Sequence, residues 1–359
     1  MTQSKRILVF RFSALGDVAM TIPVLWSFSK QYSEYEILFV SRPFAGNLVK
    51  PLPNIQFFPV DLNGRHKGLR GLFRLFRELN KNGPFDAVID LHSVLRTHVL
   101  TTLFRLSGIK TVKIDKGRNE KKALTRKHNK VFDPLPGTFA RYQNTFQRAG
   151  LSFDLIPFPG KEIFGVTQPM GKDASDKKAE PLVSPPLPHN GGIFIGIAPF
   201  ARHKWKMWPT DKMQQLIQKL DDGNNSLILF GGRGEEQKTL EKWASQLKKG
   251  CTFAGRLNLE EELQLMAKLD VMISMDSANM HLASLVGTRV VSIWGATHPY
   301  AGFYGYGQSP EDAVQIDLEC RPCSVFGNKP CHRKDFACMM RITPEMVLNK
   351  IQNKNVLPG

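Results

Sequence analysis

Short, uninterrupted apolar segments alternate with amphipathic segments along this chain. In the first half they predict strands over 6–12, 35–41, 85–92 and 111–115, and helices over 17–31 and 93–108. Continuous apolar runs are typical of strands buried on both faces, and strands that alternate with helices form parallel sheets. The first half is therefore predicted to be a doubly wound α/β domain.

The same alternation restarts after residue 192. It predicts strands over 193–199, 225–232, 271–276 and 288–295, and helices over 210–222, 234–250, 259–270 and 277–287. Between the halves the chain is rich in Pro, Gly, Ser and charged residues, which indicates a linker. A chain of 359 residues is also too long for one typical core. We expect an N-terminal domain over 1–166, a linker over 167–192, a C-terminal domain over 193–340, and a helix within 341–359 that packs back toward the N-terminal domain.

Three loops that follow predicted strands carry residues suited to chemistry. The loop FSALGD ends in Asp17, RHKWKMWP contains Lys206, and DSANMH begins with Asp276. Ligands of doubly wound domains bind outside the carboxyl ends of the strands, so two such domains in tandem are expected to place these loops around a shared cleft. The simpler alternatives are that Asp17 only caps a helix and that the basic loop is solvated.

The segments around 277–280 and 202–206 suit a phosphorylated ligand. Backbone N–H groups at the start of the helix predicted over 277–287 form a natural anion site, and His281 lies about one turn further on. The cations of 202–206 could neutralise a diphosphate. An ordinary capped helix and a flexible basic loop are the structural alternatives.

The positive charge is concentrated in the first half. Residues 1–165 hold 26 Lys and Arg against 12 Asp and Glu, whereas residues 166–359 hold 23 against 20. Such a basic half could face nucleic acid, an anionic membrane surface or a phosphorylated substrate, or form a solvated surface. Aromatic residues are not interleaved with the cations as stacking platforms, which argues against nucleic acid. With no apolar run of transmembrane length and no leader pattern, we expect a cytoplasmic protein.

Four of the five cysteines are clustered near the end of the chain. Cys320, Cys323, Cys331 and Cys338 have the spacing C-x2-C-x7-C-x6-C. They could form a structural zinc site, pack as reduced thiols, or pair as disulfides under oxidation. A catalytic role is not indicated, because no base partner is evident.

Three motifs in this order give the chain a specific resemblance. RFSALGDVAMTIP, KMWP and DSANMHLASLVGTRVVSIWGATHP resemble those of glycosyltransferase family 9, the ADP-heptose:lipopolysaccharide heptosyltransferases. The resemblance implies the GT-B architecture, with two Rossmann-like doubly wound domains and the active site in the interdomain cleft. It implies an inverting, metal-independent enzyme of lipopolysaccharide biosynthesis in the bacterial cell envelope. The enzyme would move a heptose from ADP-heptose to an anionic lipopolysaccharide core or related lipid-linked saccharide.

The resemblance also implies roles for individual residues. Asp17 corresponds to the general base, and Lys206 to the lysine that contacts the donor phosphates. Donor-binding positions are Asp276, Ser277, Ala278, His281 and Thr297, where Ala278 replaces the usual glycine. Acceptor-binding positions are Ser13, Arg96, Lys116 and Arg118. The nucleotide-sugar is the co-substrate and no cofactor is required. A monomer in peripheral contact with the inner membrane is expected, with no metal in catalysis.

Other functions remain as alternatives. A family 9-like transferase could use a different nucleotide-sugar, and a relative without catalytic activity could only bind one. A dehydrogenase would also be doubly wound, but the first loop has one glycine rather than G-x-G-x-x-G. The retained Asp17 and Lys206 argue against the inactive relative.

Overall fold

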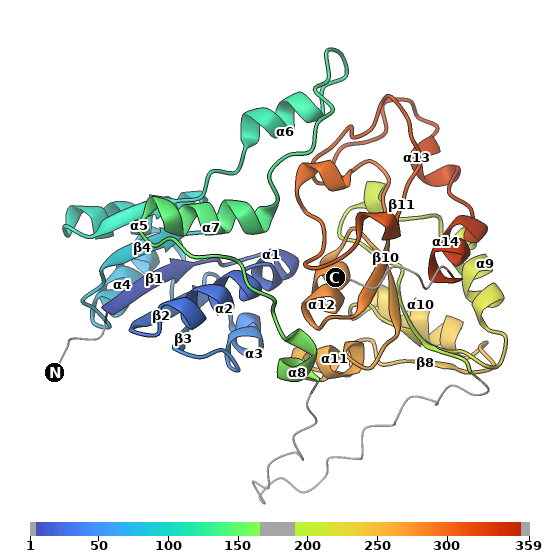
Figure 1. Cartoon of the computed structure of the whole chain (residues 1–359), viewed down its shortest axis with the longest axis horizontal. Coiled ribbons are helices and arrows are strands. Elements are labelled where there is room, and N and C mark those ends of the chain that lie inside the picture. The colour runs from blue at the N-terminus through green and yellow to red at the C-terminus, as the bar shows by residue number, and fades with distance from the viewer. Residues whose placement is uncertain (1–4, 166–190, 353–359) are drawn as a thin grey trace, which may run out of the picture. The chain divides into compact units, whose positions relative to one another are not determined.

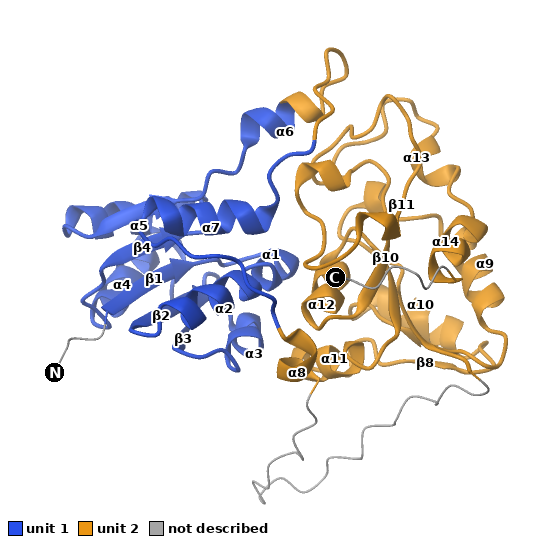
Figure 2. Ribbon diagram, in the orientation of Figure 1, with its two compact units in different colours: residues 1–122, 134–158 blue, residues 123–133, 159–359 orange. Residues whose placement is uncertain are grey.

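The computed structural model describes residues 5–165 and 191–352, which form two compact units (Figures 1 and 2). Unit 1 comprises residues 1–122 and 134–158, and unit 2 comprises 123–133 and 159–359. The segments 123–133 and 159–165 therefore group with unit 2, although the sequence placed them in the first domain. Of the predicted linker, only Gly191 and Gly192 lie within the described residues.

Unit 1 contains a five-stranded parallel sheet in the order β3-β2-β1-β4-β5. Its strands are β1 (Lys5–Phe10), β2 (Tyr35–Ser41), β3 (Ile55–Pro59), β4 (Ala87–Asp90) and β5 (Lys110–Lys113). Its helices are α1 (Leu15–Ala19), α2 (Ile22–Gln31), η1 (Pro43–Ala45), α3 (Gly46–Val49), α4 (Gly68–Asn80), α5 (Leu95–Leu106) and α7 (Thr138–Arg148), and α6 (Arg118–Leu124) crosses into unit 2. The four strands predicted for this half are confirmed as β1, β2, β4 and β5.

The helix predicted over 17–31 is divided into α1 and α2 at Met20 and Thr21. Pro23 is the second residue of α2. Proline lacks a backbone N–H and is tolerated only in the first turn of a helix, so a new helix starts just before it. The Thr21 hydroxyl donates to the Val18 carbonyl over 2.6 Å and joins the two helices.

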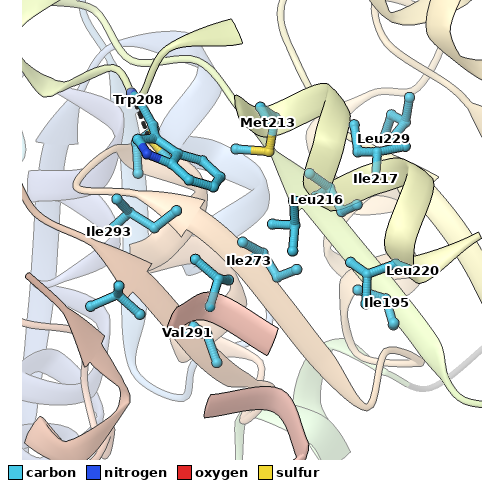
Figure 3. Close-up of a cluster of buried hydrophobic side chains, with 14 of the residues drawn as sticks. Ile195, Trp208, Met213, Leu216, Ile217, Leu220, Leu229, Ile273, Val291 and Ile293 are labelled. Atoms are coloured by element: carbon cyan, nitrogen blue, oxygen red, sulfur yellow. Dashed lines mark hydrogen bonds between the residues drawn. The ribbon is translucent and has the colours of Figure 1, made fainter. Parts of the chain in front are cut away.

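Unit 2 contains a six-stranded parallel sheet in the order β11-β10-β9-β6-β7-β8. Its strands are β6 (Phe194–Ala198), β7 (Ser226–Leu229), β8 (Gly250–Thr252), β9 (Val271–Met275), β10 (Arg289–Ile293) and β11 (Ala313–Val314). Its helices are α8 (Gly160–Phe164), η2 (Lys204–Lys206), α9 (Thr210–Leu220), α10 (Glu235–Ala244), α11 (Leu259–Met266), α12 (Ala278–Leu285), η3 (Pro299–Ala301), η4 (Pro310–Asp312), α13 (Ala337–Met340) and α14 (Pro344–Gln352). Buried side chains of the sheet and of α9 form its core, with Trp208 and Ile293 among them (Figure 3).

Helix α14 packs within unit 2. It contacts α9, β10 and β11, and its side chains Val347 and Ile351 belong to the unit 2 core. The expectation that a helix within 341–359 packs back toward the N-terminal domain stays a prediction, and the contacts with α9, β10 and β11 are those within unit 2. The apolar residues of α14 recur on one face, which predicts a buried face but does not identify the surface that covers it.

The strand order of each sheet reverses at one point. In unit 1 this switch point lies between β1 and β4, and in unit 2 it lies between β6 and β9. Ligands of doubly wound sheets bind at the carboxyl ends of the strands beside such a point. Asp17 follows β1, Lys206 follows β6 and Asp276 follows β9, so each of these residues lies beyond the carboxyl end of a strand at a switch point. None of the helices within 5–165 and 191–352 is both long and apolar enough to cross a lipid bilayer.

Candidate active site

Asp17 is the third residue of α1 and supports the start of this helix. Its Oδ2 accepts a hydrogen bond from the Ala14 backbone N–H over 3.1 Å and lies 2.8 Å from Arg11 Nη2. The expected capping role is therefore present, with the side chain reaching back to Ala14. The side chain remains 29% exposed, so a substrate can reach it. The adjacent guanidinium is the ion-pair partner of this carboxylate.

Arg11 ties the Asp17 loop to its neighbours. Its buried Nη1 donates to the Leu91 carbonyl over 2.7 Å, and its guanidinium lies 5.8 Å from the centroid of the Tyr142 ring. The Tyr142 hydroxyl donates to the Asp17 carbonyl over 3.2 Å. Burial works to lower the pKa of Arg11, but Tyr142 and Asp17 together raise that pKa above its usual value. Arg11 is therefore a permanent cation beside the Asp17 carboxylate.

His92 lies in the loop that follows β4 and is held by Asp90. The buried Asp90 Oδ1 accepts from the backbone N–H groups of His92 (2.9 Å) and Ser93 (2.8 Å). Burial, with Arg11 and Lys116, lowers the pKa of His92 to about 3. The imidazole is thus neutral near pH 7, and it packs edge-on against Phe12 with the ring centroids 5.7 Å apart. A neutral ring can hydrogen-bond to a hydroxyl without adding charge.

A polar pocket of ≈ 300 Å³ lies after β5 and is lined in part by Lys116 and Arg118. Lys116 Nζ donates to the Ser93 carbonyl over 3.1 Å. Burial lowers the pKa of Lys116, and Arg11 and Arg118 add to the effect. Burial also lowers the pKa of Lys121 to about 8. Two of the predicted acceptor residues therefore meet around one pocket that also contains the start of α6.

The other two predicted acceptor residues lie elsewhere in unit 1. Arg96 is exposed on the second residue of α5, and Ser13 is half-buried just before α1. Neither is among the described residues that line the pocket beside Lys116. Ser13 lies in the segment between β1 and α1, four residues before Asp17. It is therefore grouped with Asp17 rather than with Lys116 and Arg118.

Lys206 and Asp276 form an ion pair at the switch point of unit 2. Lys206 Nζ lies 2.8 Å from Asp276 Oδ2, and their side chains are 16% and 6% exposed. The loop that carries Lys206 is anchored by Trp208, whose buried indole N–H donates to the Ile342 carbonyl over 3.3 Å. The loop is thus shaped rather than flexible. The structure brings together two residues that the sequence assigned separately to the donor.

Gly327 packs against the aliphatic part of Lys206. A Cβ atom on Gly327 would lie 2.2 Å from Lys206 Cγ, and the backbone of Gly327 has a φ of +67°. Both properties require glycine. Gly327 therefore helps to direct Lys206 toward Asp276.

The remaining predicted donor residues surround α12. Ser277 is the N-cap residue, with its hydroxyl 3.2 Å from that of Ser274, and Ala278 is the first helical residue. Ala278 is not among the described residues with positive φ, so alanine in place of the usual glycine introduces no backbone strain. His281 is buried on α12, and Thr297 is buried in the loop after β10.

Arg321, which the sequence analysis did not single out, holds the loop after β10 in place. It is 3% exposed and donates to the carbonyls of Gly295 (2.6 Å) and Thr297 (3.0 Å). It also donates to Ile316 over 2.6 Å. A buried arginine that donates to several carbonyls fixes the backbone around it. Its place inside the cysteine motif was the only signal in the sequence.

The four clustered cysteines line one small pocket, together with Trp205 and Arg321. All four are free thiols, and Cys338 is buried. Burial raises the pKa of Cys338 to about 12 and raises the pKa of Cys323. Within the described parts of the chain, no three His, Cys, Asp or Glu side chains are arranged to hold a metal ion. The four side chains are therefore packed as free thiols around this pocket, and the structural zinc site stays an untested alternative.

Comparisons with known proteins identify a matching family and similar proteins. The model of glycosyltransferase family 9 (heptosyltransferase) matches residues 72–330. The lipopolysaccharide core heptosyltransferase OpsX of Haemophilus influenzae is 23% identical, over 82% of this chain and 80% of its own length. Lipopolysaccharide heptosyltransferase 1 of Pseudomonas aeruginosa is 22% identical, over 98% of this chain and 99% of its own.

Solved structures show the same fold. A family 9 glycosyltransferase from Veillonella parvula has a TM-score of 0.70 at 20% identity, over 98% of this chain and 97% of its own. The E. coli heptosyltransferase WaaC with ADP has a TM-score of 0.68 at 19% identity, over 96% and 98%. The two doubly wound sheets agree with the fold class that the sequence predicted. Since the family model covers well over half of the sequence, the chain belongs to glycosyltransferase family 9.

Proposed function

We propose that this protein transfers a heptose from ADP-heptose to an anionic lipopolysaccharide core or a related lipid-linked saccharide, with inversion at the anomeric carbon. The observation that carries the proposal is the presence of charged side chains at the switch point of each sheet. One has an accessible carboxylate, Asp17, and the other has a half-buried lysine, Lys206, paired with the buried Asp276 just before the start of α12. The names of the relatives support this choice of sugar and acceptor, and the E. coli neighbour was solved with ADP.

In the proposed reaction Asp17 acts as the general base. An acceptor hydroxyl oxygen attacks the anomeric carbon, and its proton passes to the Asp17 carboxylate. The bond between that carbon and the diphosphate oxygen breaks as the new glycosidic bond forms. Arg11 pairs with the carboxylate and, together with the Ala14 N–H, holds it at the start of α1, so the base is positioned in advance.

Unit 2 is proposed to receive the leaving diphosphate. Its negative charge grows as the bond breaks, and donors fixed in advance stabilise it. Lys206 would supply a cation, and the N–H groups at the start of α12 would supply the positive end of a helix dipole. In the absence of a nucleotide, Asp276 holds Lys206 in place, which reduces the cost of ordering it. Fixed cations could therefore carry the charge without a metal ion.

The acceptor is proposed to bind to unit 1. Lys116 and Arg118 around one pocket suit phosphate or carboxylate groups of a core saccharide. Arg96 and Ser13 are proposed to contact other parts of the acceptor. Because the acceptor is lipid-linked, the enzyme is proposed to work in peripheral contact with a membrane, as a monomer and without nucleic acid.

A thermal-shift screen against nucleotide-sugars tests the donor assignment. ADP-heptose at about 100 times its Kd is expected to stabilise the folded protein by roughly 2.7 kcal/mol, or about 5–10 °C in Tm. Sugars linked to GDP, UDP or dTDP are expected to give smaller shifts. A larger shift with one of these would favour the alternative, a family 9 transferase with another donor. No shift with any nucleotide-sugar would contradict the proposal.

A further inference from the structure

Helices α4 and α5 lie side by side in unit 1 (Figure 1). Phe76 of α4 and Phe104 of α5 join them, with ring centroids 4.9 Å apart. The inner side of α4 buries Leu72, Leu75 and Leu79 in the core of the unit. The pair of helices therefore presents one continuous outer surface, called here the α4–α5 surface.

The outer side of α5 exposes large apolar side chains. Leu95 and Leu106 are each 80% exposed, and they fall on the same side of a helix with 3.6 residues per turn. Exposed Thr102 lies on this side as well. The opposite side of α5 is buried through Leu100 and Phe104. Two largely exposed leucines on one side of a surface helix are unusual, because that side is ordinarily polar.

Helix α4 adds both apolar side chains and cations to this surface. Leu69 is 74% exposed and Phe73 is 51% exposed, four residues apart on one side of the helix. Beside Phe73 lies an open groove of ≈ 430 Å³, which is lined by Arg65, Arg70, Phe73, Arg74, Arg77, Glu78 and Lys81. The groove is therefore strongly basic.

The positive charge of the groove is largely uncompensated. Its one carboxylate, Glu78, already pairs with Arg65 (2.5 Å) and contacts His66 (3.1 Å). Within the described parts of the chain, Arg70, Arg74, Arg77 and Lys81 form no ion pair. An anionic partner would supply the missing counter-charge.

We infer that the α4–α5 surface docks onto an anionic lipid bilayer. Exposed Leu and Phe side chains would enter the boundary between headgroups and acyl chains, while Arg and Lys contact the lipid phosphates. This combination of large apolar and cationic side chains is typical of segments that lie on membranes. A hydrophobic protein partner would leave the row of arginines without a function.

The position of α5 connects this surface to the proposed reaction. This part of the inference rests on the proposed function, in which the acceptor is lipid-linked. Leu95 begins α5 five residues after Asp90, at the carboxyl end of the sheet where Asp17 and His92 also lie. A bilayer that contacts Leu95 would bring the saccharide of a lipid-linked acceptor to this edge. Docking would thus place the acceptor hydroxyl and the base at the same end of unit 1.

Co-sedimentation of the full chain with vesicles tests the inference. The wild-type protein is expected to bind vesicles of equal parts phosphatidylglycerol and phosphatidylcholine, and to bind pure phosphatidylcholine weakly. The double variant Phe73→Asp/Leu106→Glu is expected to lose roughly tenfold or more in partition coefficient. Arg70→Gln/Arg74→Gln is expected to lose about thirtyfold at low salt and to depend less on salt.

Met340→Glu is the matched control, because Met340 is 49% exposed but lies in unit 2. It is expected to bind vesicles as the wild type does. If the Phe73→Asp/Leu106→Glu variant fails to fold by circular dichroism, the arginine variant carries the test. The inference is overturned if the wild type ignores anionic vesicles or if the folded variants bind them equally well. ADP titration of the same proteins tests the donor site separately, so a failure there would count against the proposed function alone.

Discussion

The Asp17→Asn enzyme is expected to bind the nucleotide-sugar as tightly as the wild type and to turn over roughly 10²–10⁴-fold more slowly. The amide oxygen can still accept from the Ala14 N–H, so the start of α1 is preserved. The amide cannot take a proton from an acceptor hydroxyl. Turnover is measured by ADP release at saturating donor and acceptor, and donor affinity by calorimetric titration.

Asp154→Asn provides the control for the Asp17 prediction. Asp154 is an exposed carboxylate of the same unit, and its hydrogen bonds with Gln31 use backbone atoms of Asp154. This variant is expected to retain wild-type turnover. If Asp17→Asn also retained wild-type turnover, Asp17 could not be the base.

The Lys206→Ala enzyme is expected to bind ADP roughly 10–100-fold more weakly, because charge-assisted hydrogen bonds contribute about 1.5–3 kcal/mol each. The substitution also leaves the Asp276 carboxylate buried without its cation. Breaking such a pair costs up to about 3–5 kcal/mol, with the lower end expected here because Lys206 is partly exposed. Affinity is therefore measured by titration at a temperature where circular dichroism shows the variant to be folded.

Three further variants sharpen the Lys206 test. Lys204→Ala removes an exposed lysine from the same short helix η2 and is expected to leave ADP affinity unchanged. Gly327→Ala retains Lys206 but displaces it, and is expected to weaken binding to an intermediate extent. Gly307→Ala has a similar positive φ of +64° with no described atom within 4 Å of its Cβ position, so it controls for backbone strain alone. An unchanged ADP affinity in Lys206→Ala would exclude the proposed phosphate contact.

The sequence predicted the framework of both sheets because their strands are buried on both faces. Short uninterrupted apolar runs such as those of β1 and β9, which alternate with helical segments, are typical of such strands. Strands β3, β8 and β11 were not predicted, and β8 and β11 are segments of only three and two residues, which carry no periodic signal. Helix α4 was also missed, although Leu72, Leu75 and Leu79 recur at helical spacing. That spacing is visible in the sequence and indicates a helix with one buried side.

The site could be predicted where its residues directly follow strands. It could not be predicted where residues far apart in the sequence contact one another. Asp17, Lys206 and Asp276 lie in the segments that follow strands, so the rule for parallel sheets brings them to ligand-binding edges. The contact between Arg11 and Leu91 joins residues 80 positions apart, and that between Tyr142 and Asp17 joins residues 125 positions apart. Arg11 also lay inside a predicted strand, which concealed its role. Such contacts depend on strand order, which one sequence does not specify.

A transfer assay with ADP-heptose and a heptose-free lipopolysaccharide core tests the central claim most directly. The product is analysed by mass spectrometry for added sugar and by NMR for the configuration of the new glycosidic bond, with ADP release followed in parallel. The expected result is one heptose per acceptor, one ADP per heptose, and an anomeric configuration opposite to that of the donor. Retention of configuration, or donor binding with no heptosylated product, would contradict it.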